Sequence, residues 1–320
     1  MDNSLGLYLE KDGFYFDSIF NYKGALWHKE AICIFDNDID KYVRYISKEK
    51  IDKVIIKRES NIQSLDFLCK IPHIKYLCIA GDIDYSPLYN LKHLKLLSIS
   101  GSREIYVDKI EGLESFSTFY PGNVKGIDKA VSLKSLNLVE DYNLSKFINL
   151  DFLSNLINLD TLYLSNINLT TLEGIENLKN LKVLTLEDMN KLETIKHLTS
   201  LSSHLKSLRI ESCNKIKDFD SIRELSELVF LCIDYVRLVP NLEFISKLKH
   251  LSTFISDSSN FIDGNLTPLT NIEHAYVYPI RKHYYFIKQN ENKKAKEADF
   301  KYGERKMGDE EIELWRRIAY

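Results

Sequence analysis

The sequence predicts a repeat solenoid of the α/β class: a curved rod with a parallel β-sheet on its concave face and short helical or irregular segments on its convex face. Two observations predict it. One apolar spacing recurs along the chain, and each copy alternates apolar and polar residues with period two. Hydrophobic residues make up 44% of the 320 residues, which is enough for a continuous core.

The repeat is clearest in the second half of the chain, where LDTLYLSN begins at Leu159, LKVLTLED at Leu181, LKSLRIES at Leu205 and LVFLCIDY at Leu228. Other copies are weaker or have decayed, and they begin at Ile51, Ile74, Leu94, Leu113, Leu133, Leu251 and Ile272. Successive starts lie 19 to 26 residues apart. We therefore expect about eleven coils between residues 51 and 280.

Each copy reads as a short strand. In the copy from Leu159, Leu162 and Leu164 should face the core, while Thr161, Tyr163 and Ser165 should face out. One coil cannot bury its own leucines, so neighbouring coils must stack. The same alternation predicts burial of Leu184, Leu186, Leu208, Ile210, Leu231 and Ile233.

These copies resemble the leucine-rich-repeat family, nearest to its short-repeat, internalin-like and phosphatase-regulator-like types. The resemblance covers about residues 51–280. Family members often carry a buried Asn or Cys three residues after the last strand leucine. Here that column reads Asp82, Ser102, Asp141, Ile167, Met189, Cys213 and Val236, and only Cys213 matches. We therefore expect no asparagine ladder, and the turns must satisfy their backbone groups by other means.

Stacked coils leave an apolar face at each end, so caps are required. Residues 1–50 are predicted to form the first cap, with a strand at 31–35 and a helix at about 39–47. Asp36, Asn37 and Asp38 offer N-cap oxygens to that helix. Bulky cover for the first coil comes from Phe14, Phe16, Phe20 and Trp27.

Residues 281–320 break the pattern. The stretch IKQNENKKAKEADFKYGERK is polar and predicts a solvated linker or a mobile extension. The stretch DEEIELWRRIAY predicts a helix with acidic residues first and basic residues last. Ile312, Trp315 and Ala319 share one face of that helix. The face either packs back as a C-terminal cap or forms a separate partner-binding element.

The bulk properties narrow the classes of function. A formal net charge of −3 does not indicate a nucleic-acid binder, and no apolar run is long enough to span a membrane. The five cysteines are scattered without a CxxC pair, which favours free thiols. The first residues do not read as a secretory signal, so we expect a cytoplasmic location. The oligomeric state stays open.

No sequence motif predicts catalysis, a cofactor or a metal site. The run from Asp36 to Asp40 resembles the start of a calcium loop. However, Lys41 stands where the glycine is required, and Ser47 where the bidentate Glu should be. Helix capping explains the run better. Four histidines precede strand copies, in a position that asparagines occupy in other coils, and we expect both to serve tight turns with positive φ: His73, His93, His204, His250, Asn158, Asn180 and Asn271.

The outward strand positions of the second half are the candidate binding surface. Glu187, Glu211, Asp234 and Asp257 should project from the same position of adjacent strands, with Arg209 one column away. Aromatic side chains beside charge are typical of interaction hot spots. The candidate partner-binding residues are completed by Tyr163, Phe230, His274, Tyr276 and Tyr278. The alternative interpretation is an acidic, solvated face.

We therefore expect a non-catalytic protein-interaction module, and within that class a bacterial-type immunity or inhibitor protein that binds a basic partner on its concave face. A regulatory subunit or scaffold for another enzyme is the second interpretation. The rival class is an enzyme with a site between the solenoid and residues 281–320, which requires a deep pocket with convergent titratable groups.

Overall fold

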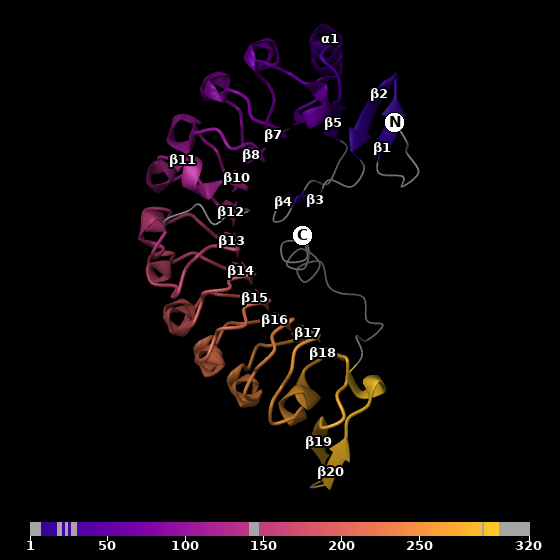
Figure 1. Ribbon diagram of the computed structural model, residues 1–320, viewed down its shortest axis with the longest axis vertical. Helices are drawn as coiled ribbons and strands as arrows, with labels where there is room; N and C mark the ends of the chain where they lie inside the picture. Colours follow the sequence, from indigo (N-terminus) through magenta and orange to yellow (C-terminus); the bar gives the residue numbers. More distant parts are fainter. Residues whose placement is uncertain are drawn as a thin grey trace. The chain divides into compact units, whose positions relative to one another are not determined.

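The computed structural model describes residues 8–17, 21–22, 25–26, 31–140, 147–289 and 291–300. They fall into two compact units, one with the described residues up to 140 and one with those from 147 on. In each unit, short parallel strands lie side by side along one side of the coils, and 3-10 helices lie along the other (Figure 1). The fold predicted from the repeat is confirmed.

The first unit opens with an antiparallel pair of strands that continues into a parallel sheet. The strand order is β1-β2-β5-β6-β7-β8-β10-β12, and pairing is parallel from β5 on. The strands are β1 (Tyr8–Lys11), β2 (Phe14–Asp17), β5 (Ala31–Ile34), β6 (Lys53–Ile56), β7 (Tyr76–Ile79), β8 (Leu96–Ile99), β10 (Ser115–Thr118) and β12 (Ser135–Val139). Two small pairs lie outside this sheet: β3 (Asn21–Tyr22) with β4 (Ala25–Leu26), and β9 (Ile105–Tyr106) with β11 (Val124–Lys125).

Helix α1 (Ile39–Glu49) follows β5, as the sequence predicts, and buries Tyr42, Val43 and Ile46 on one face. Its predicted N-cap differs in detail, because Asp38 makes no side-chain capping bond. Asp36 holds the turn instead. Its carboxylate accepts the Asp38 N–H at 2.9 Å and pairs with Lys41 at 2.8 Å.

The second unit contains the most regular coils. Its strands run in chain order as β13 (Thr161–Ser165), β14 (Val183–Glu187), β15 (Ser207–Glu211), β16 (Phe230–Asp234), β17 (Thr253–Asp257) and β18 (His274–Tyr278). All pair in parallel. Every core leucine and isoleucine predicted for β13–β16 has no exposed surface, so the predicted alternation is confirmed. In both units each of the eleven predicted copies contains a described strand, which begins two residues after the start of the copy.

The return segments are short 3-10 helices. In the first unit these are Arg58–Ser60, Asp66–Lys70, Ser86–Asn90, Val107–Lys109, Pro121–Asn123 and Ile127–Lys129. In the second unit they are Asp151–Leu153, Ile175–Asn177, Lys196–Leu201, Phe219–Glu224, Glu243–Lys247, Thr267–Asn271 and Glu297–Phe300. Most of them place one or two apolar side chains in the core, for example Ile175 and Ile222.

Positive φ angles occur at a different place in the coil from the one predicted. None of the seven histidines and asparagines expected to adopt positive φ does so, although all lie in the described ranges. The left-handed residue is instead the first one after each strand of β13–β17: Asn166, Asp188, Ser212, Tyr235 and Ser258, with φ between 51° and 57°. Each donates its backbone N–H to the last strand residue of the next coil, at 2.6–3.0 Å. This row of turns satisfies the backbone where an asparagine ladder is missing.

Residues 285–300 do not form the predicted solvated linker. Strands β19 (Tyr285–Lys288) and β20 (Glu291–Lys294) pair as an antiparallel hairpin, and Ala295 and Phe300 are buried. The charged composition misled because only a few apolar side chains anchor the segment, such as Phe286 against Phe300. The helix predicted in residues 309–320 lies outside the described residues, as do the side chains of Phe20 and Trp27.

Candidate functional site

The inner face of the second unit, defined as the strand side chains of β13–β18 that point away from the coil core, carries all ten predicted binding residues. Strand register sets their order. Ser165, Glu187, Glu211 and Asp234 are direct neighbours across β13–β16, and Asp257 neighbours Tyr278. Glu187, Glu211 and Asp234 therefore form a column in register, on strands that lie about 4.8 Å apart, and Asp257 follows on the next strand, β17.

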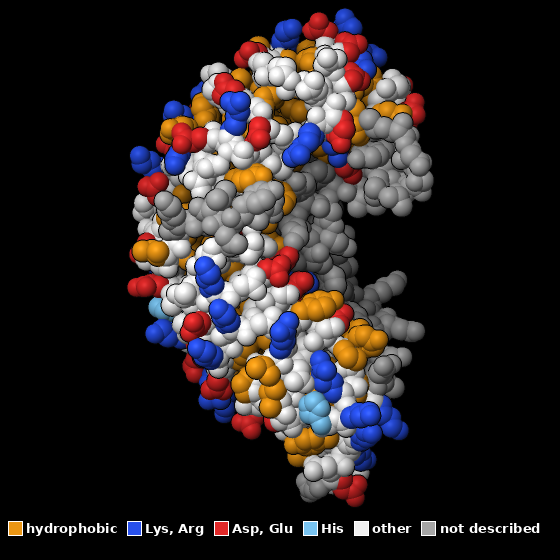
Figure 2. Space-filling view, in the orientation of Figure 1, with side chains coloured by type: hydrophobic (Ala, Val, Ile, Leu, Met, Phe, Trp, Pro, Cys, Tyr) orange, Lys and Arg blue, Asp and Glu red, His pale blue; other side chains and the backbone are white. Residues whose placement is uncertain are grey.

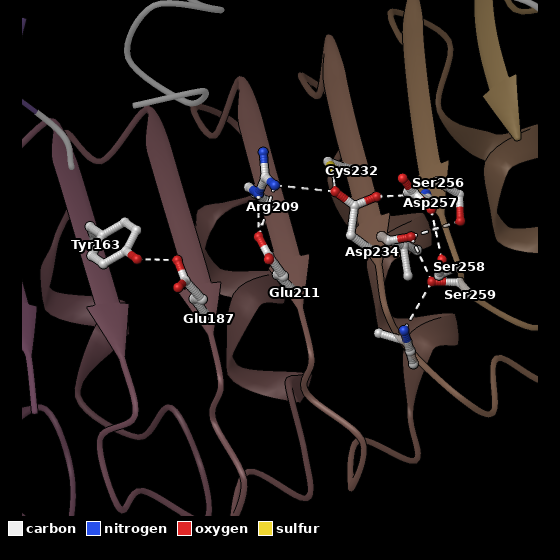
Figure 3. A network of polar contacts seen from close by, with 12 residues as sticks. Tyr163, Glu187, Arg209, Glu211, Cys232, Asp234, Ser256, Asp257, Ser258 and Ser259 are labelled. Atoms are coloured by element: carbon white, nitrogen blue, oxygen red, sulfur yellow. Dashed lines mark hydrogen bonds and ion pairs between the residues drawn. The ribbon is translucent and has the colours of Figure 1, made fainter. Parts of the chain in front are cut away.

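Arg209 lies between two of these carboxylates (Figure 3). Its Nη2 is 2.8 Å from Oε2 of Glu211 and 3.2 Å from Oδ2 of Asp234, and its Nε donates to Glu211 at 3.1 Å. Burial opposes the charge on Arg209, yet the negative groups around it raise its pKa. It is the one cation among the described inner-face side chains of β14–β17.

Asp234 differs from the other acids because only 5% of the residue is exposed. Its Oδ2 accepts from the Cys232 thiol at 3.0 Å, and its Oδ1 accepts the backbone N–H of Asp257 at 2.8 Å. Burial, and then the charge of Asp234, raise the pKa of Cys232 far above that of a free thiol. Asp234 thus links β16 to β17 and contributes to the structure of the site.

Glu187 accepts a hydrogen bond from the hydroxyl of Tyr163 on the preceding strand (Figure 3). Burial, and then this bond to a carboxylate, raise the pKa of Tyr163. At the other end of the column, Asp257 accepts from the Ser258 hydroxyl at 2.7 Å. Glu187, Glu211 and Asp257 all keep part of their surface exposed, so their charge reaches solvent.

The aromatic residues are less exposed than the sequence predicted. Tyr163, Phe230 and His274 are buried, Tyr276 is half-buried, and Tyr278 is 48% exposed. Phe230 packs with Val183, Cys232 and Ile255 into an apolar cluster on the inner face. Among the predicted binding residues, Tyr276 and Tyr278 are the aromatic side chains that a partner can reach in the described conformation.

Several residues of this site were not predicted. Ser259 occupies the turn column that ends in Cys213 and Val236. Its Oγ donates to Ile233 O at 2.8 Å and accepts the Val236 N–H at 3.0 Å (Figure 3). Ser256 also donates to Ile233 O, at 2.7 Å. The repeat spacing could have identified Ser259, because it lies one 23-residue repeat after Val236. The hydrogen bond of the Cys232 thiol could not be predicted, because it depends on side-chain conformation.

Among the described residues, no group of His, Cys, Asp and Glu side chains is arranged to hold a metal ion. All five cysteines are free. No described helix has the length and apolar character needed to cross a membrane. A recess of about 360 Å³ lies between β18 and the hairpin, where the rival enzyme reading would place its site. Its acidic and basic lining consists of Glu273, Lys288 and Asp299, and no Ser, Cys or His lines it.

Comparison with known proteins agrees with this fold. Residues 157–200 match the family described as leucine-rich repeats (two copies). An internalin (InlF) from Listeria monocytogenes is 19% identical and superposes with a TM-score of 0.51 over 70% of this chain and 66% of its own. The functional domain of InlJ from the same organism is 16% identical, with a TM-score of 0.49 over 69% and 51%. This chain thus spans just under two thirds of the first and about half of the second. No curated protein matches the sequence.

Proposed function

We propose that this chain, a leucine-rich-repeat protein by its fold, binds a basic partner protein on the inner face of its second unit. Leucine-rich-repeat proteins generally mediate protein–protein interactions, and a rigid sheet presents its outward side chains in register. The observation that carries the proposal is the charge on this face: four carboxylates in consecutive strands are accompanied by one guanidinium.

The excess charge lies where a partner can use it. Arg209 bonds to both Glu211 and Asp234, whereas Glu187 accepts a hydrogen bond from the Tyr163 hydroxyl and Asp257 accepts one from the Ser258 hydroxyl. Like charges on adjacent strands repel, and an approaching cationic surface relieves that repulsion. Tyr278, at the end of the same column, and Tyr276, in the neighbouring column, supply half-exposed aromatic surface.

We further propose that binding inhibits the partner, as in a bacterial-type immunity protein that covers a cationic protein in the cytoplasm. A broad face with little apolar surface suits occlusion of a charged region. Five free cysteines, four of them buried, suit a reducing compartment.

The test is affinity capture from cells of the native source with two baits, the parent and the variant Glu187→Gln/Glu211→Gln/Asp257→Asn, followed by quantitative mass spectrometry. The triple variant leaves the structural Asp234 intact. A matched control, Glu173→Gln/Glu224→Gln/Glu243→Gln, removes three exposed acids from the return segments of the same unit.

The proposal expects a protein with a basic surface that the parent and the control retain and the triple variant loses. Purified partner activity should fall when the parent is added. If the parent and the triple variant recover the same amount of the partner, the partner binds outside the acidic column. If the activity of the partner is unaffected by the parent, the chain binds the partner without inhibiting it.

A further inference from the structure

A second surface of the same unit carries the opposite charge. It lies where the coils turn away from the ends of β15–β17, and we call it the flank patch: Lys215, Lys217, Arg237, Leu238, Pro240 and Ile262. Figure 2 shows Lys and Arg side chains interleaved with hydrophobic ones on the half of the molecule that contains β14–β18. Sequence reasoning did not single these residues out, because they follow the strands and do not form part of them.

A backbone bridge between two adjacent coils forces the side chains of Leu238 and Ile262 to face solvent. Val239 and Phe261 form a parallel bridge, and both side chains are buried. Successive side chains of extended backbone alternate in direction, so the residues beside them must face solvent. Leu238 is accordingly 62% exposed and Ile262 49%. Single exposed apolar residues are ordinary, but here two lie on adjacent coils, on either side of the bridge between Val239 and Phe261.

The basic side chains of the patch are available. Lys215 and Arg237 are exposed and form no ion pair with a described carboxylate. Lys217 meets Glu193 at 2.9 Å, but both side chains are largely in solvent, where such a pair contributes little. The backbone N–H of Arg237 is fixed by Asn214 Oδ1 at 2.8 Å, which holds the base of its side chain beside the preceding coil.

A groove runs through the patch. Lys215, Ile216 and Lys217 line it from one coil and Leu238 and Pro240 from the next, together with Glu193 and Asn214, around a volume of about 570 Å³. Its lining is largely apolar, and its charged groups are two ammonium groups and the one carboxylate of Glu193, so positive charge is in excess. This combination fits an apolar side chain whose neighbours carry negative charge.

We propose that the flank patch binds an acidic segment of a partner protein, with an aliphatic or aromatic side chain seated in the groove. A recess with a charged rim favours a peptide over an anionic membrane, because a bilayer surface would leave the recess unfilled. The occupant differs in sign from the basic partner of the inner face, so this surface does not depend on the function proposed above.

The test begins with a phage-displayed random peptide library selected on the parent protein, with counter-selection on Arg237→Glu/Leu238→Asp. Selected peptides should carry Asp or Glu on both sides of an apolar residue. By fluorescence anisotropy, Lys215→Glu/Arg237→Glu should weaken the binding of a selected peptide at least about tenfold, roughly 1.4 kcal/mol. Leu238→Ser should weaken it without changing its salt dependence.

Two controls separate this site from net charge and from the inner face. Lys247→Glu/Lys249→Glu makes the same charge change on exposed residues of a return segment and should bind the peptide as the parent does. The triple carboxylate variant of the inner face should also bind it unchanged. The proposal fails if no acidic motif is selected. It fails too if Lys215→Glu/Arg237→Glu and Lys247→Glu/Lys249→Glu weaken peptide binding equally. It also fails if only vesicles containing anionic lipid, and no peptide, distinguish the patch variant from the parent.

Discussion

Asp234 is the carboxylate of the inner face that the structure uses most fully. It contacts Arg209, the Cys232 thiol and the backbone N–H of Asp257 while almost completely buried. Replacing it with asparagine keeps its size but removes the charge that faces Arg209. The free energy of unfolding should therefore fall by about 1–3 kcal/mol, measured by urea denaturation. Asp257→Asn, at a half-exposed position, should change it by less than about 0.5 kcal/mol. Equal effects of the two substitutions would contradict the distinction.

The thiols provide a second test at this scale. Burial raises the pKa of Cys33 and of Cys213 from 9.0 to about 12, whereas Cys69 is exposed. The native protein should therefore react with Ellman's reagent at Cys69 and conceal the other four thiols until it unfolds. Because the thiol pKa is higher in the folded protein than in the unfolded chain, the unfolded chain loses its thiol protons first as pH rises. The free energy of unfolding should therefore fall between pH 9.0 and about 12. The urea midpoint should fall over that window, and rapid labelling of all five thiols at neutral pH would refute the burial.

At the scale of elements, the left-handed turns after β13–β17 provide backbone hydrogen bonds between adjacent coils where the strands end. Ser212 has a φ of 56°, its backbone N–H donates to Asp234 O at 3.0 Å, and its carbonyl oxygen accepts from the Asn214 side-chain amide at 3.2 Å. Ser212→Val should lower the free energy of unfolding by about 1–2 kcal/mol, because a β-branched residue is strained in this conformation. Ser212→Gly should be neutral or stabilising. If the two variants melt at the same temperature, the left-handed turn does not limit stability.

The stability of the strands depends on complete burial of their core-facing side chains. Leu184 has no exposed surface and lies in register between Leu162 and Leu208. Leu184→Asp should unfold the coils around β14, since an unpaired buried charge costs several kcal/mol. Hydrogen exchange of the β13–β15 amides should report this loss. Lys179→Asp, at an exposed position on the preceding return segment, should leave the exchange unchanged.

The strands could be predicted from the sequence because a single alternating pattern decides both their start and their buried face. The turns could not, because positive φ depends on backbone geometry that several residue types accept. Asn166 and Asp188 are common in such turns, but Tyr235 is not, and the histidines that looked suited to them lie elsewhere. The hairpin of β19 and β20 escaped notice because β20 is entirely polar and the core contacts of the hairpin come from a few residues around Phe286.

At the scale of the whole chain, a formal charge of −3 conceals two surfaces of opposite sign on the second unit. Strand periodicity predicted the position of the acidic column on the inner face. The partners of its carboxylates could not be predicted, because Arg209 bonds both within its own strand and to the next one, and Tyr163 bonds to the strand that follows its own. The flank patch could not be predicted from the sequence, because its residues follow no repeating pattern. Their exposure becomes apparent only once the turns after β15–β17 are known.

The most direct test of the proposed function is the affinity of the captured basic partner for the parent and for Glu187→Gln/Glu211→Gln/Asp257→Asn, measured by surface plasmon resonance at low and high salt. The triple variant should bind at least about tenfold more weakly at low salt, mostly through slower association, and the difference should shrink as salt screens the charges. If the triple variant binds this partner as tightly and as fast as the parent at low salt, the acidic column is a solvated face and not the binding site.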